Sequence, residues 1–132
     1  MSKSIYSIIP DPEALLALEP EELAGVVLEH FNSMDAHEQA QLNRHNFTLS
    51  YTVESYPATY RDKILRALSE SWAWLEREGL IAEKPANESS GGWYYVTKRG
   101  QQITKAADLD AYRRADMLPK RLLHRHAASH EC

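Results

Sequence analysis

Apolar side chains recur at helical spacing in two long segments of this chain. The first begins at Pro20, and its first turn is acidic, as the positive end of a helix dipole favours. Its apolar positions are Leu23, Val26, Val27, Leu28 and Phe31. The second, residues 58–78, has no internal glycine or proline and ends before Gly79, where helices often take a left-handed cap. Its apolar stripe is Ile64, Leu65, Leu68, Trp72 and Leu75, so the spacing predicts two core-facing helices.

Shorter helices are predicted around these two. Asp11 before Pro12 is a typical start, because the carboxylate can accept from free N–H groups and proline suits the first helical position. This helix should end before Pro20. A second short helix is predicted over residues 37–42. A third begins after Thr97, which can cap it, and carries the apolar residues Ile103, Ala106, Ala107 and Leu109.

Three segments are predicted as strands. In residues 47–53 aromatic and aliphatic side chains alternate with Thr and Ser, the period of a half-buried strand. Residues 80–84 follow Gly79, and residues 93–97 follow a polar loop that contains Gly91 and Gly92. The expected fold class is α+β and winged-helix-like, α-rich with a small three-stranded antiparallel sheet. The expected domains are a winged-helix-like unit over residues 1–110 and a C-terminal helical extension over residues 111–132.

Two motifs carry a resemblance to winged-helix proteins. They are WLEREGLIAEKP at residues 74–85 and GWYYVTKRG at residues 92–100. In the first, a helix ends at glycine and leads into a wing strand. In the second, a strand ends in Val-Thr-x-x-Gly and a helix follows. The resemblance implies DNA binding through a helix-turn-helix, with the turn at Ser55–Pro57 or near Ser69–Ser71.

More narrowly, the chain is similar to the N-terminal region of a bacterial family of uncharacterised Ymh-type proteins. The matching pieces are PEELAGVVLEHFNS, YPATYRDKILRALSESWAWLEREGLIA, GGWYYVTKRGQQI and ADMLPKRLLH, which together span residues 20–124. In that family a second, helical domain usually follows the last of these pieces. The resemblance therefore implies an isolated N-terminal domain or a truncated member, in a bacterial cytoplasm.

Charge is distributed unevenly along the 132 residues. The whole chain has a formal net charge of −4, but residues 1–60 carry −7 and residues 61–132 carry +3. A basic half on an acidic protein can still attract phosphates, because the local field acts over distances of about 8–10 Å. The alternative is a solvated face with a basic tail. The single cysteine, Cys132, excludes an internal disulfide framework, and no apolar run is long enough to span a membrane.

The basic half supplies the candidate DNA contacts. In a helix-turn-helix the start of the second helix enters the major groove, where its side chains reach phosphates and base edges. On fold analogy, double-stranded DNA is the expected partner and the role is regulatory. The alternative is an exposed helix face with ion pairs such as Asp62 with Arg66. The candidates are Tyr56, Tyr60, Arg61, Lys63 and Arg66 on the long helix, with Lys84, Lys98 and Arg99 beside the wing.

A different function class is also open. Trp74, Trp93 and Tyr95 lie near the junction of helix and wing and could anchor a homodimer or another partner, because aromatic residues are enriched at interface hot spots. The alternative for these aromatic residues is packing of the wing against the helix. In this hypothesis the chain is a protein-interaction module on a winged-helix scaffold, which suits the acidic half better than DNA binding does.

Catalytic and metal-binding signals are weak. No paired nucleophile and base, phosphate-binding glycine loop or facing carboxylate pair occurs in the sequence, and His30 is expected at a helix edge as a capping or surface residue. The chain is therefore predicted not to be an enzyme and to need no cofactor. A terminal run of possible zinc ligands is interpreted as accidental: His124, His126, His130 and Cys132.

Overall fold

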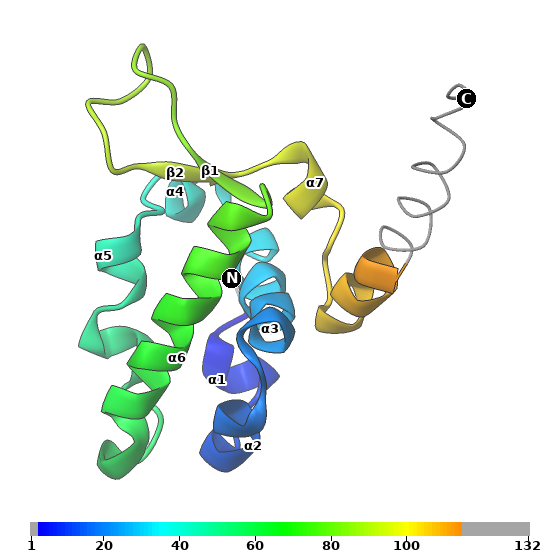
Figure 1. The fold of residues 1–132 in the computed structure, drawn as a ribbon. Coiled ribbons are helices and arrows are strands. Elements are labelled where there is room, and N and C mark those ends of the chain that lie inside the picture. Colours follow the sequence, from blue (N-terminus) through cyan, green and yellow to red (C-terminus); the bar gives the residue numbers. More distant parts are fainter. Residues whose placement is uncertain (1–2, 115–132) are drawn as a thin grey trace.

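The computed structural model describes residues 3–114, an assembly of helices with one β-hairpin at one end (Figure 1). The helices are α1 (Ile5–Ile8), α2 (Pro12–Ala17), α3 (Pro20–Asn32), α4 (Ala36–Gln39), α5 (Arg44–Phe47), the 3₁₀ helix η1 (Ser50–Val53), α6 (Ala58–Arg77) and α7 (Lys98–Gln101). The strands are β1 (Ile81–Glu83) and β2 (Tyr94–Val96), and residues 106–114 form a further helical segment. None of the helices in residues 3–114 is long and apolar enough to cross a membrane.

The two predicted long helices, α3 and α6, lie side by side and bury their apolar stripes against each other. Trp72 of α6 is the largest fully buried side chain, at 1% exposure. Its ring packs within 5.0–6.0 Å, between centroids, of three aromatic rings: Phe31 of α3, Phe47 of α5 and Tyr94 of β2. The core is therefore centred where both helices meet the hairpin.

The predicted helix ends are confirmed. The Asp11 carboxylate accepts from the backbone N–H of Glu13, which caps α2. Glu19 and Glu22 form a reciprocal capping box at the start of α3, with Pro20 at its first position. Gly79 follows α6 with φ of +75°, the left-handed conformation predicted for it. α6 runs unbroken through residues 69–71, so the turn before it lies at residues 54–57.

The hairpin is antiparallel, with Ile81 opposite Val96 and Glu83 opposite Tyr94. The Thr97 hydroxyl accepts from the N–H of Gly100 and so caps α7, as predicted. On its other side, β2 receives one further backbone contact, because the N–H of Tyr94 donates to the carbonyl oxygen of Leu42 at 2.8 Å. Among the described residues the sheet thus has two strands, with Leu42 at the outer edge of β2.

The predicted strand over residues 47–53 is wrong. Residues 44–47 form α5, and residues 50–53 form η1. Asn43 caps α5 by accepting from the N–H of Asn46, and the Thr48 hydroxyl donates to the carbonyl oxygen of Arg44 at 2.8 Å. Such local side-chain bonds compete with a strand ladder. The side chains are also not buried at every second position, because Tyr51, which the strand would place on its buried face, is 59% exposed.

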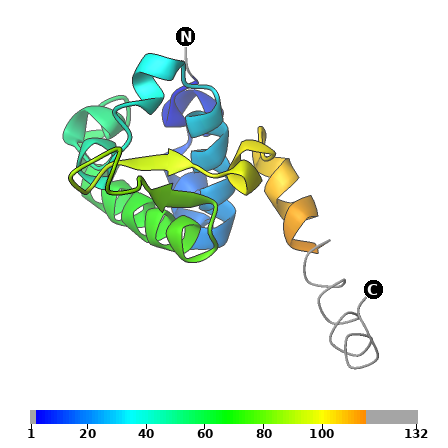
Figure 2. The same cartoon turned by 90° about the horizontal axis from the view of Figure 1, so that it is seen from above.

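The helix predicted after Thr97 is interrupted. α7 ends at Gln101, and the side-chain amide of Asn32 donates to the carbonyl oxygens of both Gly100 and Ile103 at 2.9 and 2.7 Å. These bonds to α3 hold the break in place. Residues 106–114 then pack beside α3 (Figure 2), where a Cβ added at Gly25 would lie 2.9 Å from the carbonyl oxygen of Ala106. Most of the predicted extension over residues 111–132 lies outside the described residues.

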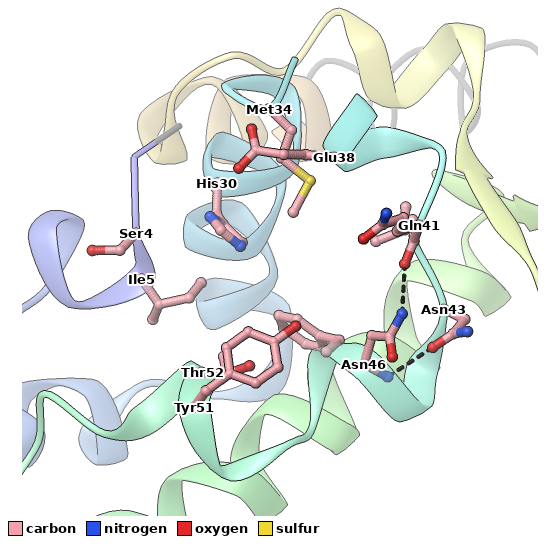
Figure 3. Close-up of a pocket in the computed structure, with 12 residues that line it drawn as sticks. Ser4, Ile5, His30, Met34, Glu38, Gln41, Asn43, Asn46, Tyr51 and Thr52 are labelled. Carbon is pink, nitrogen blue, oxygen red and sulfur yellow. Dashed lines mark hydrogen bonds between the residues drawn. The ribbon is translucent and has the colours of Figure 1, made fainter. Parts of the chain in front are cut away.

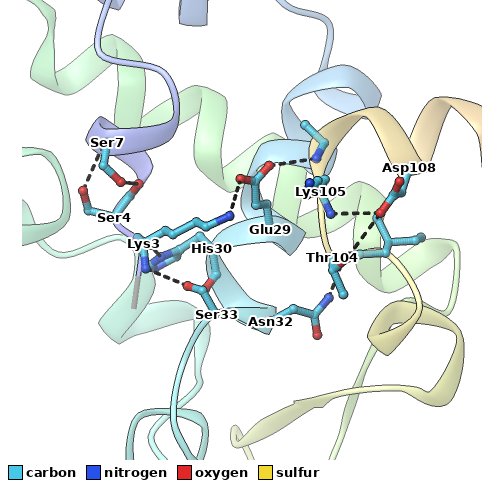
Figure 4. Close-up of polar contacts among 12 residues, drawn as sticks. Lys3, Ser4, Ser7, Glu29, His30, Asn32, Ser33, Thr104, Lys105 and Asp108 are labelled. Atoms are coloured by element: carbon cyan, nitrogen blue, oxygen red, sulfur yellow. Dashed lines mark hydrogen bonds and ion pairs between the residues drawn. The ribbon is translucent and has the colours of Figure 1, made fainter. Parts of the chain in front are cut away.

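One side chain of α3 joins both ends of the described chain. The Glu29 carboxylate accepts from Nζ of Lys3 at 3.1 Å and from the backbone N–H of Ala106 at 2.9 Å (Figure 4). Ser33 adds a bond by accepting from the backbone N–H of Lys3 at 2.8 Å. The N-terminal segment and residues 106–114 are therefore both fastened to α3.

Candidate nucleic-acid and protein interfaces

The predicted DNA contacts fall near the two ends of α6. Lys63 and Arg66 lie in its first half, whereas Lys98 and Arg99 follow the hairpin at its far end (Figure 1). From Lys63 to Glu78, where Arg99 makes contact, the helix rises about 22 Å at about 1.5 Å per residue. The eight predicted residues thus do not form one compact basic patch.

Tyr56 is a core residue rather than a side chain that can reach a phosphate. It is 1% exposed, its hydroxyl donates to the carbonyl oxygen of Ile9 at 2.7 Å, and its ring meets Tyr6 edge-on. Burial raises the pKa of Tyr56 to about 12. Its phenol therefore secures the α1–α2 connection against the start of α6.

Two more predicted contacts are engaged within the protein. Nε of Arg61 donates to the carbonyl oxygen of Tyr56 at 2.8 Å, and Nη2 donates to that of Glu54 at 2.9 Å. Arg61 thus holds the turn between η1 and α6. The Tyr60 hydroxyl donates to the Glu13 carboxylate at 2.9 Å, and this hydrogen bond raises the pKa of Tyr60. Both side chains stabilise the entry of α6.

The remaining basic candidates are less constrained. Lys63 and Arg66 are exposed on α6, and the alternative ion pair between Asp62 and Arg66 is not formed. Lys98 is exposed on α7, and Lys84 is half-buried at the start of the hairpin loop. Arg99 donates through Nη1 to the carbonyl oxygen of Glu78 at 3.2 Å, at the C-terminal end of α6. The free positive charge on α6 thus comes from Lys63 and Arg66 in its first half and from Arg77 at its end.

The three predicted interface aromatics have different surroundings. Trp74 is half-buried, and the guanidinium carbon of Arg113 lies 6.0 Å from its ring centroid. Residues 106–114 therefore cover part of it. Trp93 is half-buried and Tyr95 is 41% exposed, both on the face of β2 opposite to the core-facing Tyr94. Trp93 and Tyr95 are thus partly exposed side by side on the hairpin.

The outer edge of β1 has unpaired backbone groups. The N–H of Lys84 donates to Trp93, and the N–H of Thr97 donates to Leu80, so residues 80, 82 and 84 face β2. In an antiparallel ladder the intervening residues, Ile81 and Glu83, then direct their N–H and C=O groups away from β2. Within residues 3–114 no other strand pairs with β1. Ile81 is 1% exposed whereas Glu83 is exposed, so this edge is open to an added strand at Glu83.

A cavity of about 320 Å³ lies beside α3, away from the hairpin edge. It is bounded by α1, by the end of α3 and by the stretch from α4 to η1 (Figure 3). Ile5, Met34, Leu42 and Phe47 give it apolar walls, and His30 lies among them. The sequence did not indicate this cavity, because its lining comes from five separate elements that carry no shared motif.

His30 is more buried than the predicted surface or capping residue. Its Nδ1 meets the carbonyl oxygen of Lys3, and burial lowers the pKa of His30 below 6.5 despite that bond and the nearby Glu38. In the neutral ring Nδ1 donates to this carbonyl, which leaves Nε2 as an acceptor. His30 thus contributes a neutral imidazole to the cavity wall.

The free energy of unfolding should fall when the pH is lowered through the range just below 6.5. Above that pH, His30 is neutral in both the folded and the unfolded chain. Below it, the unfolded chain takes up a proton on His30 before the folded chain does, and this favours unfolding. The loss ends once the pH is under the folded pKa. Urea unfolding at pH 7.5, 6.5 and 5.5 measures it, and His30→Gln should reduce the slope. An unchanged slope in this variant would contradict the assignment.

Metal binding finds no support in the part of the chain that is described. No three His, Cys, Asp or Glu side chains gather there closely enough to hold an ion. The run of possible zinc ligands from His124 to Cys132, interpreted as accidental, lies outside the described residues.

No protein-family model, curated protein or solved structure matches the sequence.

Proposed function

We propose that this chain is a winged-helix-type domain that acts as a protein-interaction module and forms a homodimer along β1. The observation that carries the proposal is the edge of β1 at Glu83, which is exposed and has no strand partner among residues 3–114. DNA binding is the second candidate. Three of the residues predicted to contact DNA, Tyr56, Tyr60 and Arg61, instead form hydrogen bonds within the protein. Both functions suit a reduced, cytoplasmic protein without enzymatic activity.

The arrangement of elements supports the winged-helix scaffold. α3 is followed by Leu42 at the edge of the sheet, then by α5 and η1, then by α6 and the hairpin. Across the sheet the order is Leu42, β2, β1, so a single backbone contact at Leu42, rather than a strand over residues 47–53, lies beside β2. The long helix leads into a two-stranded hairpin, which supports the interpretation of that hairpin as a wing.

A second copy of the chain is the partner that fits this edge. Two β1 strands related by a two-fold axis run antiparallel, so the exposed Glu83 of each copy can exchange backbone hydrogen bonds with the edge of the other. Tyr95, exposed opposite Ala82, would extend an aromatic face across the joined sheet.

A matched pair of variants at Glu83 tests the dimer. Glu83→Pro and Glu83→Ala both remove the carboxylate, but only proline removes the outward N–H, and an edge position tolerates it. Sedimentation velocity should show a dimer for the parent chain, a retained dimer for Glu83→Ala and a monomer for Glu83→Pro, all with the same circular dichroism. A parent chain that is monomeric at about 100 µM, a concentration far above micromolar affinity, would overturn the proposal.

DNA binding is favoured by one observation, the exposure of Lys63 and Arg66 in the first half of α6. If these residues and the hairpin cations Lys84 and Lys98 meet four phosphates, the salt slope of log K should be roughly −3.6, at about 0.9 per phosphate. Fluorescence anisotropy with mixed duplex DNA measures it. Lys63→Glu with Arg66→Glu should abolish binding, whereas Arg77→Glu with Lys105→Glu, an equal change of charge elsewhere, should not.

A further inference from the structure

The cavity beside α3 carries an inference that is independent of the hairpin edge. Its volume, about 320 Å³, is at the lower end of the range of about 300–1,000 Å³ found for small-molecule sites. The apolar side chains Ile5, Met34, Leu42 and Phe47 form its walls, and polar side chains are interleaved with them. This composition suits a small, mainly apolar ring that carries a few polar atoms.

One amide side chain in the wall has an atom left over for such a ring. Nδ2 of Asn46 donates to the carbonyl oxygen of Gln41, so its Oδ1 remains as an acceptor. This oxygen has no other partner among residues 3–114. Oδ1 of Asn43 accepts from the N–H of Asn46, and the amide nitrogen of Asn43 points away from the cavity (Figure 3). An acceptor in the wall matches an amino group on the edge of a ring.

Two further groups complete the match. Nε2 of His30, whose Nδ1 faces Lys3, adds an acceptor to the same cavity. Tyr51 also lines the cavity, yet it is 59% exposed and its hydroxyl makes no hydrogen bond within the described chain. A large exposed aromatic ring at the rim of a cavity is a platform on which a flat heterocycle can stack. No cationic side chain lines the cavity to hold a phosphate.

We propose that this cavity binds an uncharged, planar nitrogen heterocycle of nucleobase size, with an amino group on one edge. Asn46 and His30 accept from that amino group, and Tyr51 stacks on the ring. The ring lies between the helices rather than on the hairpin, so occupation of the site does not require the homodimer. The same chemistry is available from a free base or from a nucleoside whose sugar projects past Tyr51.

Isothermal titration calorimetry with adenine, adenosine and unsubstituted purine tests the site. Adenine should bind at least about 10-fold more tightly than purine, which lacks the amino group. With purine bound, the hydrogen-bond acceptors in the cavity wall would be buried without a donor. Adenosine binding as tightly as adenine identifies the nucleoside as an acceptable ligand, and adenosine failing to bind restricts the site to the free base. Absence of heat with both at millimolar concentration overturns the proposal.

Tyr51 provides the matched variants, since it is exposed and its loss should leave the fold intact. Tyr51→Phe keeps the stacking ring and should bind adenine like the parent chain. Tyr51→Ala should weaken binding about 10-fold or more, the effect of losing one stacked base. If Tyr51→Ala binds as tightly as Tyr51→Phe, adenine occupies a different place and the assignment fails.

Discussion

Replacing Trp72 by alanine should lower the free energy of unfolding by about 3–5 kcal/mol, the range for a buried tryptophan in a core. The indole is 1% exposed and joins α3, α5, α6 and the hairpin through its contacts with Phe31, Phe47 and Tyr94. Deleting it removes those contacts and leaves a cavity where the elements converge. Urea denaturation followed by circular dichroism measures the loss.

The control for this variant is Trp72→Phe. Nε1 of Trp72 is buried and makes no hydrogen bond with the described residues. Phenylalanine therefore removes an unsatisfied donor while it keeps an aromatic ring, and its cost should be well below that of alanine. Equal losses for both variants would mean that the indole nitrogen has a partner. A loss under about 1 kcal/mol for Trp72→Ala would contradict the position of Trp72 in the core.

The second large effect is expected at Gly100. A Cβ atom there would lie 2.2 Å from the carbonyl oxygen of Leu80 and 2.7 Å from Cγ1 of Val96. The Leu80 oxygen belongs to the backbone that begins β1, so it cannot move without disturbing the hairpin. Gly100→Ala should therefore cost about 3 kcal/mol, the upper part of the usual range for overpacking. Thermal unfolding should show the loss as a lowered Tm.

Gly92→Ala is the comparison for Gly100. Gly92 has φ of +83° but no atom within 4 Å of its added Cβ, so only backbone strain of about 1–2 kcal/mol is expected. A smaller loss for Gly100→Ala than for Gly92→Ala would contradict the close approach of α7 to Leu80. The glycine in the Val-Thr-x-x-Gly motif is thus required for packing, since its φ is not in the left-handed region.

The parts of the fold that follow from local chemistry could be predicted from the sequence. Asp11 and Thr97 mark helix starts through capping bonds within a few residues, Pro20 marks one through its position as the first helical residue, and Gly79 marks an end through its own φ. The α6 stripe follows from periodicity alone. Residues 47–53 could not be predicted in this way, because the apolar residues of two short helical turns happen to alternate in the sequence as they would in a strand. The side-chain hydrogen bonds of Asn43 and Thr48 to nearby backbone groups favour the helical turns.

The candidate sites were harder to predict, since a charged or aromatic residue does not reveal its partner in the sequence. Arg61 has the spacing of an exposed helix residue, yet its guanidinium bonds two carbonyl oxygens of the preceding turn. Tyr56 precedes a helix start but fills the core. The cavity around His30 depends on residues from Ser4 to Thr52 that meet only after folding. Sequence reasoning found the exposed cations but not these tertiary partners.

The shared carboxylate of Glu29 couples two parts of the chain that lie at opposite ends of the described sequence. Lys3, which it holds, precedes the cavity residues Ser4 and Ile5, and Ala106, which it also holds, begins the last helical segment. If the N-terminal segment or the segment from residue 106 detaches from α3, the Glu29 side chain is no longer held in place. The hydrogen bond between Glu29 and the other segment is then weakened. Amide hydrogens of both segments should therefore exchange with solvent as one cooperative unit, and a disturbance at residue 106 would reach the cavity through α3.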